Sequence, residues 1–240
     1  MLTVNRLKRL TRREYWYDRL MKRHLVSTRH TIEKLGVGYG GWHVPTDMIQ
    51  SDWVVYSFGI GEDITFDLDM IDRFGCAVHG FDPTPRAIEY AESLGDAHPN
   101  FKFHPLGVWS EDTTIRFYNP RKAHFASYSI LNLRHQDDYI EADVRTFRSL
   151  MTKLGHDHVD LIKMDIEGAE QSVLPNLIAD NVRPRVLCVE YDQPVETFSR
   201  LALQCFIRAL KLTRALKAVG YHLVVVDGWT TTYIHESANQ

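Results

Sequence analysis

The stretch Trp53-Val-Val-Tyr-Ser-Phe-Gly-Ile-Gly-Glu-Asp63 decides the fold class of this chain. Its first part is apolar and predicts a buried strand, which ends at two glycines spaced two residues apart. Glycines at such a turn let the backbone approach a ligand closely. The residues that follow, up to about Phe74, predict a helix whose free N–H groups point at the same space. The stretch therefore predicts a strand, a ligand-binding turn and a helix.

The same alternation continues along the chain. Further strands are expected at 77–81, 101–104, 159–164 and 185–189, with helices at 85–94, 145–154, 168–180 and 196–219. Residues 109–118 predict a strand pair, and residues 221–226 and 230–234 predict a hairpin around Asp227-Gly228. Strands that alternate with helices indicate an α/β protein with a mostly parallel sheet, covered on both faces. We expect one domain at 51–240, preceded by an N-terminal helical extension and glycine-rich loop at 1–50.

The extension is basic. Residues 5–35 have helical spacing and predict one or two helices, and residues 1–30 hold nine Arg and Lys against two acids. Such a segment could pack on the domain or cover a site, form a homodimer contact or bind a polyanion, or lie on a membrane surface. The stretch Gly36–Pro45, which has four glycines in its first six residues, predicts a loop after it.

Composition narrows the class of protein. The 240 residues are 44% hydrophobic and 25% charged, and the three cysteines form no CxxC pair. These figures exclude a disordered chain and a disulfide-rich miniprotein. No apolar run approaches the roughly 20 residues of a membrane span, and no secretory signal is evident, so we expect a cytoplasmic protein. The net charge is −3 and residues 1–30 contribute +7, which leaves −10 for the rest and argues against a specific nucleic-acid partner.

Acidic residues at the first two strand ends favour a cationic nucleoside. Glu62 and Asp63 stand where a dinucleotide-binding protein would hold a pyrophosphate, so they disfavour NAD and suit the sulfonium of S-adenosylmethionine. Asp82 lies 21 residues beyond Gly61, at the end of the second strand, where an acid accepts hydrogen bonds from ribose hydroxyls. Thr84 and Pro85 could border the adenine. Asp82 could also serve only as a cap for the next helix.

Two later strands also end in acids. Asp165 directly follows the strand predicted at 159–164, and Glu190 directly follows the strand predicted at 185–189. Adjacent parallel strands lie about 4.8 Å apart, so both carboxylates can face one small volume. There they could share a proton, bind a divalent ion or flank a substrate hydroxyl.

The segment Asp160-Leu-Ile-Lys-Met-Asp-Ile-Glu-Gly-Ala-Glu170 resembles the D-x-I-K-x-D-x-E-G-x-E signature of the FkbM family of S-adenosylmethionine-dependent methyltransferases. The resemblance covers roughly residues 50–235 and implies a class I methyltransferase (Rossmann-like) fold, a seven-stranded mostly parallel sheet with an antiparallel last strand. With the strand-end pattern, it predicts cofactor contacts from Ser57, Phe58, Gly59, Gly61, Asp63, Asp82, Pro83, Thr84, Gly107, Val108 and Asp165. The chain departs from the family at Ser57, where an acid is usual, and at Glu62 and Asp63, where a glycine usually closes the turn.

The family implies O-methylation of a sugar, oligosaccharide or polysaccharide hydroxyl. A polyketide or other small metabolite is the second acceptor class, and a non-catalytic nucleotide-binding scaffold is the alternative of another class. Asp165, Glu190 and His43 are the catalytic candidates, with His124 and His135 as further bases. The acids resemble those of metal-dependent O-methyltransferases, which suggests Mg²⁺ on Asp165 and Glu190. The aromatic residues Trp42, Trp109, Tyr128 and Tyr191 could stack on sugar rings, although core packing is the alternative.

Overall fold

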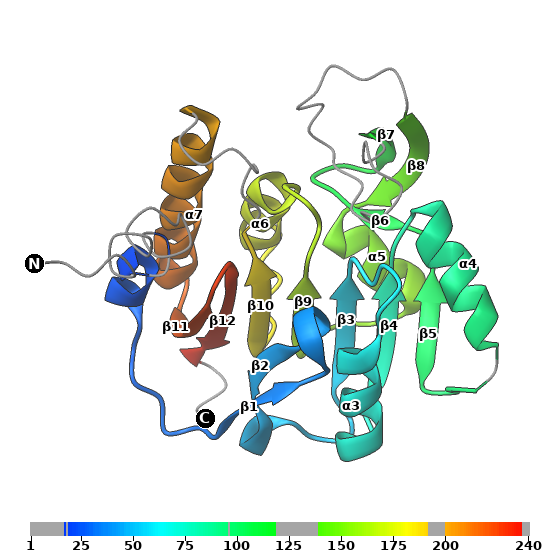
Figure 1. Ribbon diagram of the computed structural model, residues 1–240, viewed down its shortest axis with the longest axis horizontal. Coiled ribbons are helices and arrows are strands. Elements are labelled where there is room, and N and C mark those ends of the chain that lie inside the picture. The colour runs from blue at the N-terminus through cyan, green and yellow to red at the C-terminus, as the bar shows by residue number, and fades with distance from the viewer. Residues whose placement is uncertain (1–16, 18, 96, 119–138, 192–199, 237–240) are drawn as a thin grey trace, which may run out of the picture.

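A seven-stranded sheet forms the centre of the protein (Figure 1). The computed structural model describes residues 17, 19–95, 97–118, 139–191 and 200–236. In spatial order the strands are β11 (Tyr221–Asp227), β12 (Thr230–His235), β10 (Val186–Glu190), β9 (Leu161–Met164), β3 (Val54–Phe58), β4 (Ala77–Phe81) and β5 (Phe101–His104). The strand β12 runs opposite to the other six strands of this sheet, which all run in one direction. The expected mostly parallel sheet with an antiparallel last strand is confirmed.

Both faces of the sheet are covered. One face packs against α5 (Phe147–Leu154), α6 (Glu170–Ala179) and α7 (Arg200–Ala218). The other packs against α3 (Thr65–Phe74), α4 (Pro85–Leu94) and the hairpin of β1 (Ile32–Leu35) and β2 (Trp42–Pro45). Figure 1 shows this hairpin and α3 in front of the sheet. Alternate residues of a strand point to opposite faces of the sheet, and here both faces are covered. The central strands are therefore mostly apolar on both sides.

The hairpin corrects the helical prediction for part of the N-terminal segment. Residues 17 and 19–21 are helical, and Tyr17 and Met21 are buried one helical turn apart, as the spacing predicted. Residues 32–35, however, form β1 and pair antiparallel with β2. Their helical spacing is overridden by this pairing and by burial of Leu35, Trp42 and Val44 on the sheet. Residues 5–16 lie outside the described part of the chain, and the division at residue 50 stays a prediction.

A second small sheet replaces the expected strand pair at 109–118. There β7 (Thr113–Tyr118) pairs antiparallel with β8 (Tyr139–Arg145), which also pairs in parallel with β6 (Gly107–Val108). The pairing partner is therefore distant in sequence, and local periodicity carries no sign of it. The next helix ends at the predicted residue 154 but begins at Phe147, two residues later than predicted, because Thr146 is its N-cap and accepts a hydrogen bond from the Ser149 N–H at 3.2 Å.

A buried histidine cluster lies within the α5–α7 side of the sheet. His79 on β4 and His104 on β5 are joined by a 3.0 Å contact between Nδ1 and Nε2, and Tyr56 bonds His156 at 2.7 Å. Burial lowers the pKa of His79 to about 3, and the neighbouring His156 and His104 add to the shift. The pKa of His104 falls to about 4 for the same main reason. The packing here therefore requires neutral imidazoles. Among the described helices, none is both long and apolar enough to cross a membrane.

Candidate functional site

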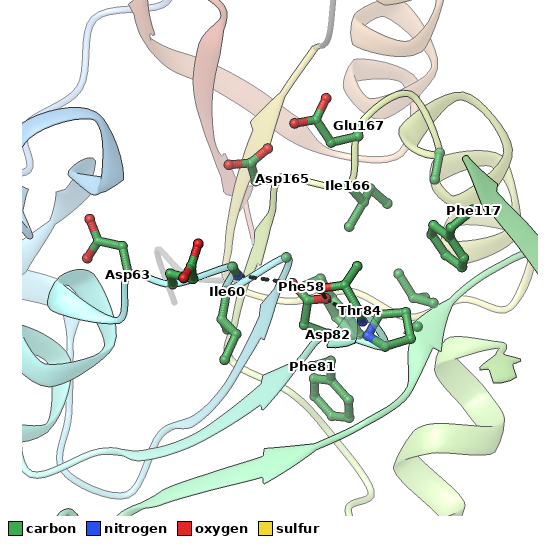
Figure 2. A pocket seen from close by; sticks show the side chains of 17 residues that line it. Phe58, Ile60, Asp63, Phe81, Asp82, Thr84, Phe117, Asp165, Ile166 and Glu167 are labelled. Atoms are coloured by element: carbon green, nitrogen blue, oxygen red, sulfur yellow. Dashed lines mark hydrogen bonds between the residues drawn. The ribbon is translucent and has the colours of Figure 1, made fainter. Parts of the chain in front are cut away.

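A cavity of about 180 Å³ lies where the strand order of the sheet reverses. The strand β3 has β4 on one side and β9 on the other, and ligands of open α/β sheets bind beyond the carboxyl ends of strands at such a point. The lining comes from the ends of β3, β4 and β9, from the start of α6 and from the small sheet (Figure 2). Ten of the eleven predicted cofactor residues are part of it, namely Phe58, Gly59, Gly61, Asp63, Asp82, Pro83, Thr84, Gly107, Val108 and Asp165.

The glycine turn brings the ends of β3 and β9 into backbone contact. Gly59 has φ +73°, and a Cβ atom there would lie 1.7 Å from the carbonyl oxygen of Asp165. Its N–H donates to the Phe81 carbonyl at 2.9 Å, which also fixes the turn against β4. Gly61 has φ +52° with open space where a Cβ would be. Gly59 is therefore required by crowding, and Gly61 by its backbone angle alone.

Asp82 has both a structural and a ligand-binding capacity. It is 6% exposed, and its Oδ2 accepts a hydrogen bond from the Gly61 N–H at 3.0 Å. Its Oδ1 accepts from the N–H and the hydroxyl of Thr84 at 2.9 and 2.7 Å. A carboxylate has about four acceptor positions, so one on Oδ2 remains for a ligand hydroxyl. Capping of the loop before α4 and ribose binding are compatible at this residue.

Neighbouring groups partly compensate the negative charges of the two acids in the glycine turn. Asp63 accepts a 2.8 Å hydrogen bond from the N–H of Thr65, the first residue of α3. Glu62 lies 3.7 Å from the guanidinium of Arg86 on α4. The turn is therefore less negative than its sequence suggests, although both carboxylates belong to the cavity lining.

Ser57 lies behind the turn and not in the cavity lining. It is fully buried, as are Asp67 on α3 and Lys163 on β9. The Lys163 ammonium donates a 2.8 Å hydrogen bond to the Gly59 carbonyl and lies 5.7 Å from the Trp42 ring centroid. Burial raises the pKa of Asp67 to about 6, an effect that the Lys163 charge opposes. Through the Gly59 carbonyl, the Lys163 ammonium holds the glycine turn, and Lys163 is not part of the cavity lining.

Three carboxylates lie near one end of the cavity. Asp165 is half-buried, and burial raises its pKa, an effect that the Lys163 charge opposes and the Asp82 charge reinforces. Burial also raises the pKa of Glu190 to about 8, with the charges of Asp165 and Glu167 adding to the shift. The ends of β9 and β10 are neighbours in the sheet, with Met164 opposite Val189, and the Asp165 charge acts on Glu190, although Glu190 is not part of the lining. Figure 2 shows Asp165 and Glu167 on the side of the cavity away from Phe117.

The loop after β9 has an unusual backbone. Glu167 has φ +51° and Gly168 has φ +99°. The buried side chain of Glu170 accepts hydrogen bonds from the N–H groups of Ile166 and Gly168 at 3.2 and 3.4 Å. Burial raises the pKa of Glu170 to about 8. Glu170 thus holds this loop in shape at the start of α6.

His43 is placed away from the cavity lining. Its Nδ1 lies 3.5 Å from Asp227 at the end of β11, and its carbonyl accepts a hydrogen bond from the Thr232 hydroxyl. Trp42 is buried on the sheet, and the Tyr191 hydroxyl bonds that of Tyr233 at 3.1 Å, so both pack in the core. His124, His135 and Tyr128 lie outside the described residues.

Seven cavity residues were not among the predicted cofactor contacts: Ile60, Glu62, Phe81, Ile166, Glu167, Ala169 and Phe117. Ile60, Glu62 and Phe81 lie beside predicted contacts at the ends of β3 and β4, and Ile166, Glu167 and Ala169 follow β9 and belong to the quoted signature. Phe117 is different, because it comes from β7 and reaches the cavity only through the pairing of β7 with β8. Its spacing in the sequence carried no signal for this position.

The donor set does not fit the predicted Mg²⁺ site. Within the described ranges, no group of three or more His, Cys, Asp or Glu side chains is arranged to hold a metal ion. Asp165 and Glu190 alone supply two carboxylates, and no step below is routed through a metal.

Comparisons with known proteins give a match to one family model. The family model described as a methyltransferase FkbM domain matches residues 54–223. The "Probable methyltransferase-like protein 24" of Rattus norvegicus is 30% identical over 133 residues, which are 55% of this chain and 30% of that protein. The Homo sapiens protein of the same name is 29% identical over the same length and shares. The match thus spans about 30% of the length of these relatives. Among solved structures, a chain of a fibrillarin/Nop5p complex has a TM-score of 0.44 at 12% identity, covering 78% of this chain and 74% of that one.

Proposed function

This chain belongs to the FkbM methyltransferase family, and from that premise we propose that it transfers a methyl group from S-adenosylmethionine to a hydroxyl of a sugar, oligosaccharide or polysaccharide. The observation that carries the proposal is the cavity at the ends of β3, β4 and β9, which combines a glycine turn, a spare acceptor on Asp82 and a half-buried Asp165. When bound, the cofactor supplies an electrophilic methyl carbon on a sulfonium.

The chain's own residues account for binding and orientation. The Gly59–Gly61 turn admits a ligand close to the backbone, and the free acceptor of Asp82 suits a ribose hydroxyl. Carboxylates at one end of the cavity favour a positively charged sulfur over a diphosphate. In an in-line displacement the acceptor oxygen must lie behind the methyl carbon, so alignment supplies much of the rate.

The proton of the acceptor hydroxyl needs a base. The C–O bond forms as the C–S bond breaks, the electron pair goes to sulfur, and the hydroxyl proton must leave. Burial raises the pKa of both Asp165 and Glu190, so in this proposal the two carboxyl groups share one proton, and Asp165, which lines the cavity, accepts the hydroxyl proton. Glu190 then acts as a neighbouring hydrogen-bond donor to the acceptor or to Asp165.

Transfer of labelled methyl from S-adenosylmethionine to a panel of oligosaccharides tests the proposal. We expect Asp165→Asn to lower kcat by about 100-fold or more, as loss of a general base does, while S-adenosylhomocysteine still binds. Glu89→Gln on α4, which removes an exposed charge, is the control. If methyl is transferred only to a small-metabolite extract, the acceptor is a small metabolite and not a sugar. Binding without transfer to either panel would favour the non-catalytic scaffold.

The metal prediction is tested in the same assay. Activity that survives a chelator is the result expected from a reaction without Mg²⁺, and activity restored only by Mg²⁺ would contradict it. The homodimer and the cytoplasmic location also stay predictions, and the homodimer is checked by measuring the mass of the protein in solution.

A further inference from the structure

The cavity has two chemically different ends. Asp63, Asp165 and Glu167 lie toward one end, whereas Phe117 and Ile166 border the other (Figure 2). The lining also includes the apolar residues Pro83, Val108 and Ala169. Asp82 lies between the two ends, with Thr84 beside it. A ligand with a charged end, a hydroxylated centre and a flat aromatic end matches this order.

Phe117 is held at the apolar end by the small sheet. It pairs with Ile140 across the ribbon of β7 and β8, and its side chain packs against Ala142 and Val144. The strand β8 also pairs with β6, whose Gly107 and Val108 line the cavity. A Cβ atom on Gly107 would lie 2.9 Å from the Val144 side chain and 3.7 Å from the Phe117 ring. The absence of a side chain at Gly107 therefore lets the ribbon pack close to the cavity.

We propose that the Phe117 ring is the wall against which the adenine of the cofactor packs, so that the β7–β8 ribbon is part of the cofactor site. The proposal rests on the proposed function and adds a residue from outside the seven-stranded sheet. An aromatic ring recognises the face of a base and not its hydrogen-bonding edge. Phe117 therefore contributes affinity for an aromatic base, while the polar groups around Asp82 set the position of the sugar.

The experiment compares two ligands that share adenosine. S-adenosylhomocysteine and 5′-methylthioadenosine have the same base and ribose, but only the first has the amino-acid end. Loss of base stacking costs about ten- to a hundredfold in affinity. We expect Phe117→Ala to weaken both ligands by the same factor within this range, in calorimetric titrations of the full chain. Phe117→Tyr, which keeps the ring, should bind within about threefold of the unmodified protein.

Ile115→Ala provides the matched control. Ile115 lies two residues before Phe117 on the same strand and packs against the same cluster, but it does not line the cavity. We expect it to bind both ligands as the unmodified protein does. An equal loss in Ile115→Ala and Phe117→Ala would overturn the proposal, because Phe117 would then act only through folding of the ribbon.

The outcomes separate this inference from the function on which it rests. If the unmodified protein binds S-adenosylhomocysteine and Phe117→Ala binds it equally well, the inference is wrong and the proposed function stands. If Phe117→Ala weakens S-adenosylhomocysteine but not 5′-methylthioadenosine, the ring contacts the amino-acid end and the inference is also wrong. If the unmodified protein binds neither ligand, the proposed function fails and the inference fails with it.

Discussion

Gly59→Ala should lower the free energy of unfolding far more than a glycine-to-alanine change at the same backbone angle elsewhere in the protein. Gly59 and Gly155 both have φ +73°, but a Cβ on Gly155 would have nothing within 4 Å. A left-handed backbone costs an L residue about 1–2 kcal/mol, so Gly155→Ala should lower the free energy of unfolding by that amount. At Gly59 the new Cβ would lie 1.7 Å from the Asp165 carbonyl oxygen, so the two backbones must separate by more than about 1 Å to restore contact distance.

That separation breaks two further interactions. The Asp165 N–H donates to the Phe58 carbonyl at 3.1 Å, and Lys163 donates to the Gly59 carbonyl at 2.8 Å. A neutral hydrogen bond contributes about 0.5–1.5 kcal/mol and a charged one about 1.5–3 kcal/mol. With the backbone cost included, we expect Gly59→Ala to lower the free energy of unfolding by about 3–6 kcal/mol.

Urea unfolding of both variants, followed by circular dichroism, measures the two losses. Titration with S-adenosylhomocysteine then reports on the cavity, and we expect binding to be lost in Gly59→Ala and retained in Gly155→Ala. Equal losses of stability in the two variants would show that the close contact between the ends of β3 and β9 does not exist in solution. Full binding by a stable Gly59→Ala protein would refute the reasoning in the same way.

Three other perturbations test separate parts of the structure. The pKa of His79 is lowered to about 3 from an ordinary 6.5, so its contribution to stability is present above pH 6.5 and is lost as the pH falls. The loss at pH 5 should be about 2 kcal/mol, and His79→Leu should shrink the difference between urea midpoints at pH 7 and pH 5. Lys163→Met leaves Asp67 buried without its counter-charge and should cost about 3–5 kcal/mol in denaturant unfolding. The double variant Lys163→Met/Asp67→Leu should recover part of that loss, and a double variant no more stable than the single one would argue against the pairing. Asp82→Ala should weaken S-adenosylhomocysteine by about tenfold or more in calorimetry, because Gly61 and Thr84 also lose their acceptor, whereas Thr84→Val removes one hydrogen bond and should cost less.

Local signals predicted most of the sheet and its helices. The strands at 77–81 and 101–104 and the helix at 85–94 begin and end where the sequence predicts them. Prolines and glycines mark those boundaries, and the apolar strands between them need no distant information. The glycine turn and Asp82 were predictable for the same reason, since their position follows from being the last residues of parallel strands.

The sequence predictions failed mainly where a segment pairs with another that is distant in the sequence. Residues 32–35 have helical spacing, but they become β1 because β2 and the buried face of the sheet accept them as a strand. Phe117 reaches the cavity because β7 pairs with β8, and those strands are separated by residues 119–138. Ser57 alternates to the face of the sheet away from the cavity, toward Asp67 and Lys163, and that orientation follows from the strand register.

The position of β12 bears on how the protein should be shortened for experiments. The region of family similarity ends at residue 223, whereas β12 comprises Thr230–His235 and fills the gap between β10 and β11 (Figure 1). A fragment trimmed to the matched region would lose this interior strand and half of its neighbour. The hydrogen-bonding edge of β10 would then be open to other molecules, which invites aggregation. Expression boundaries should therefore follow the order of strands in space and keep the chain through residue 235.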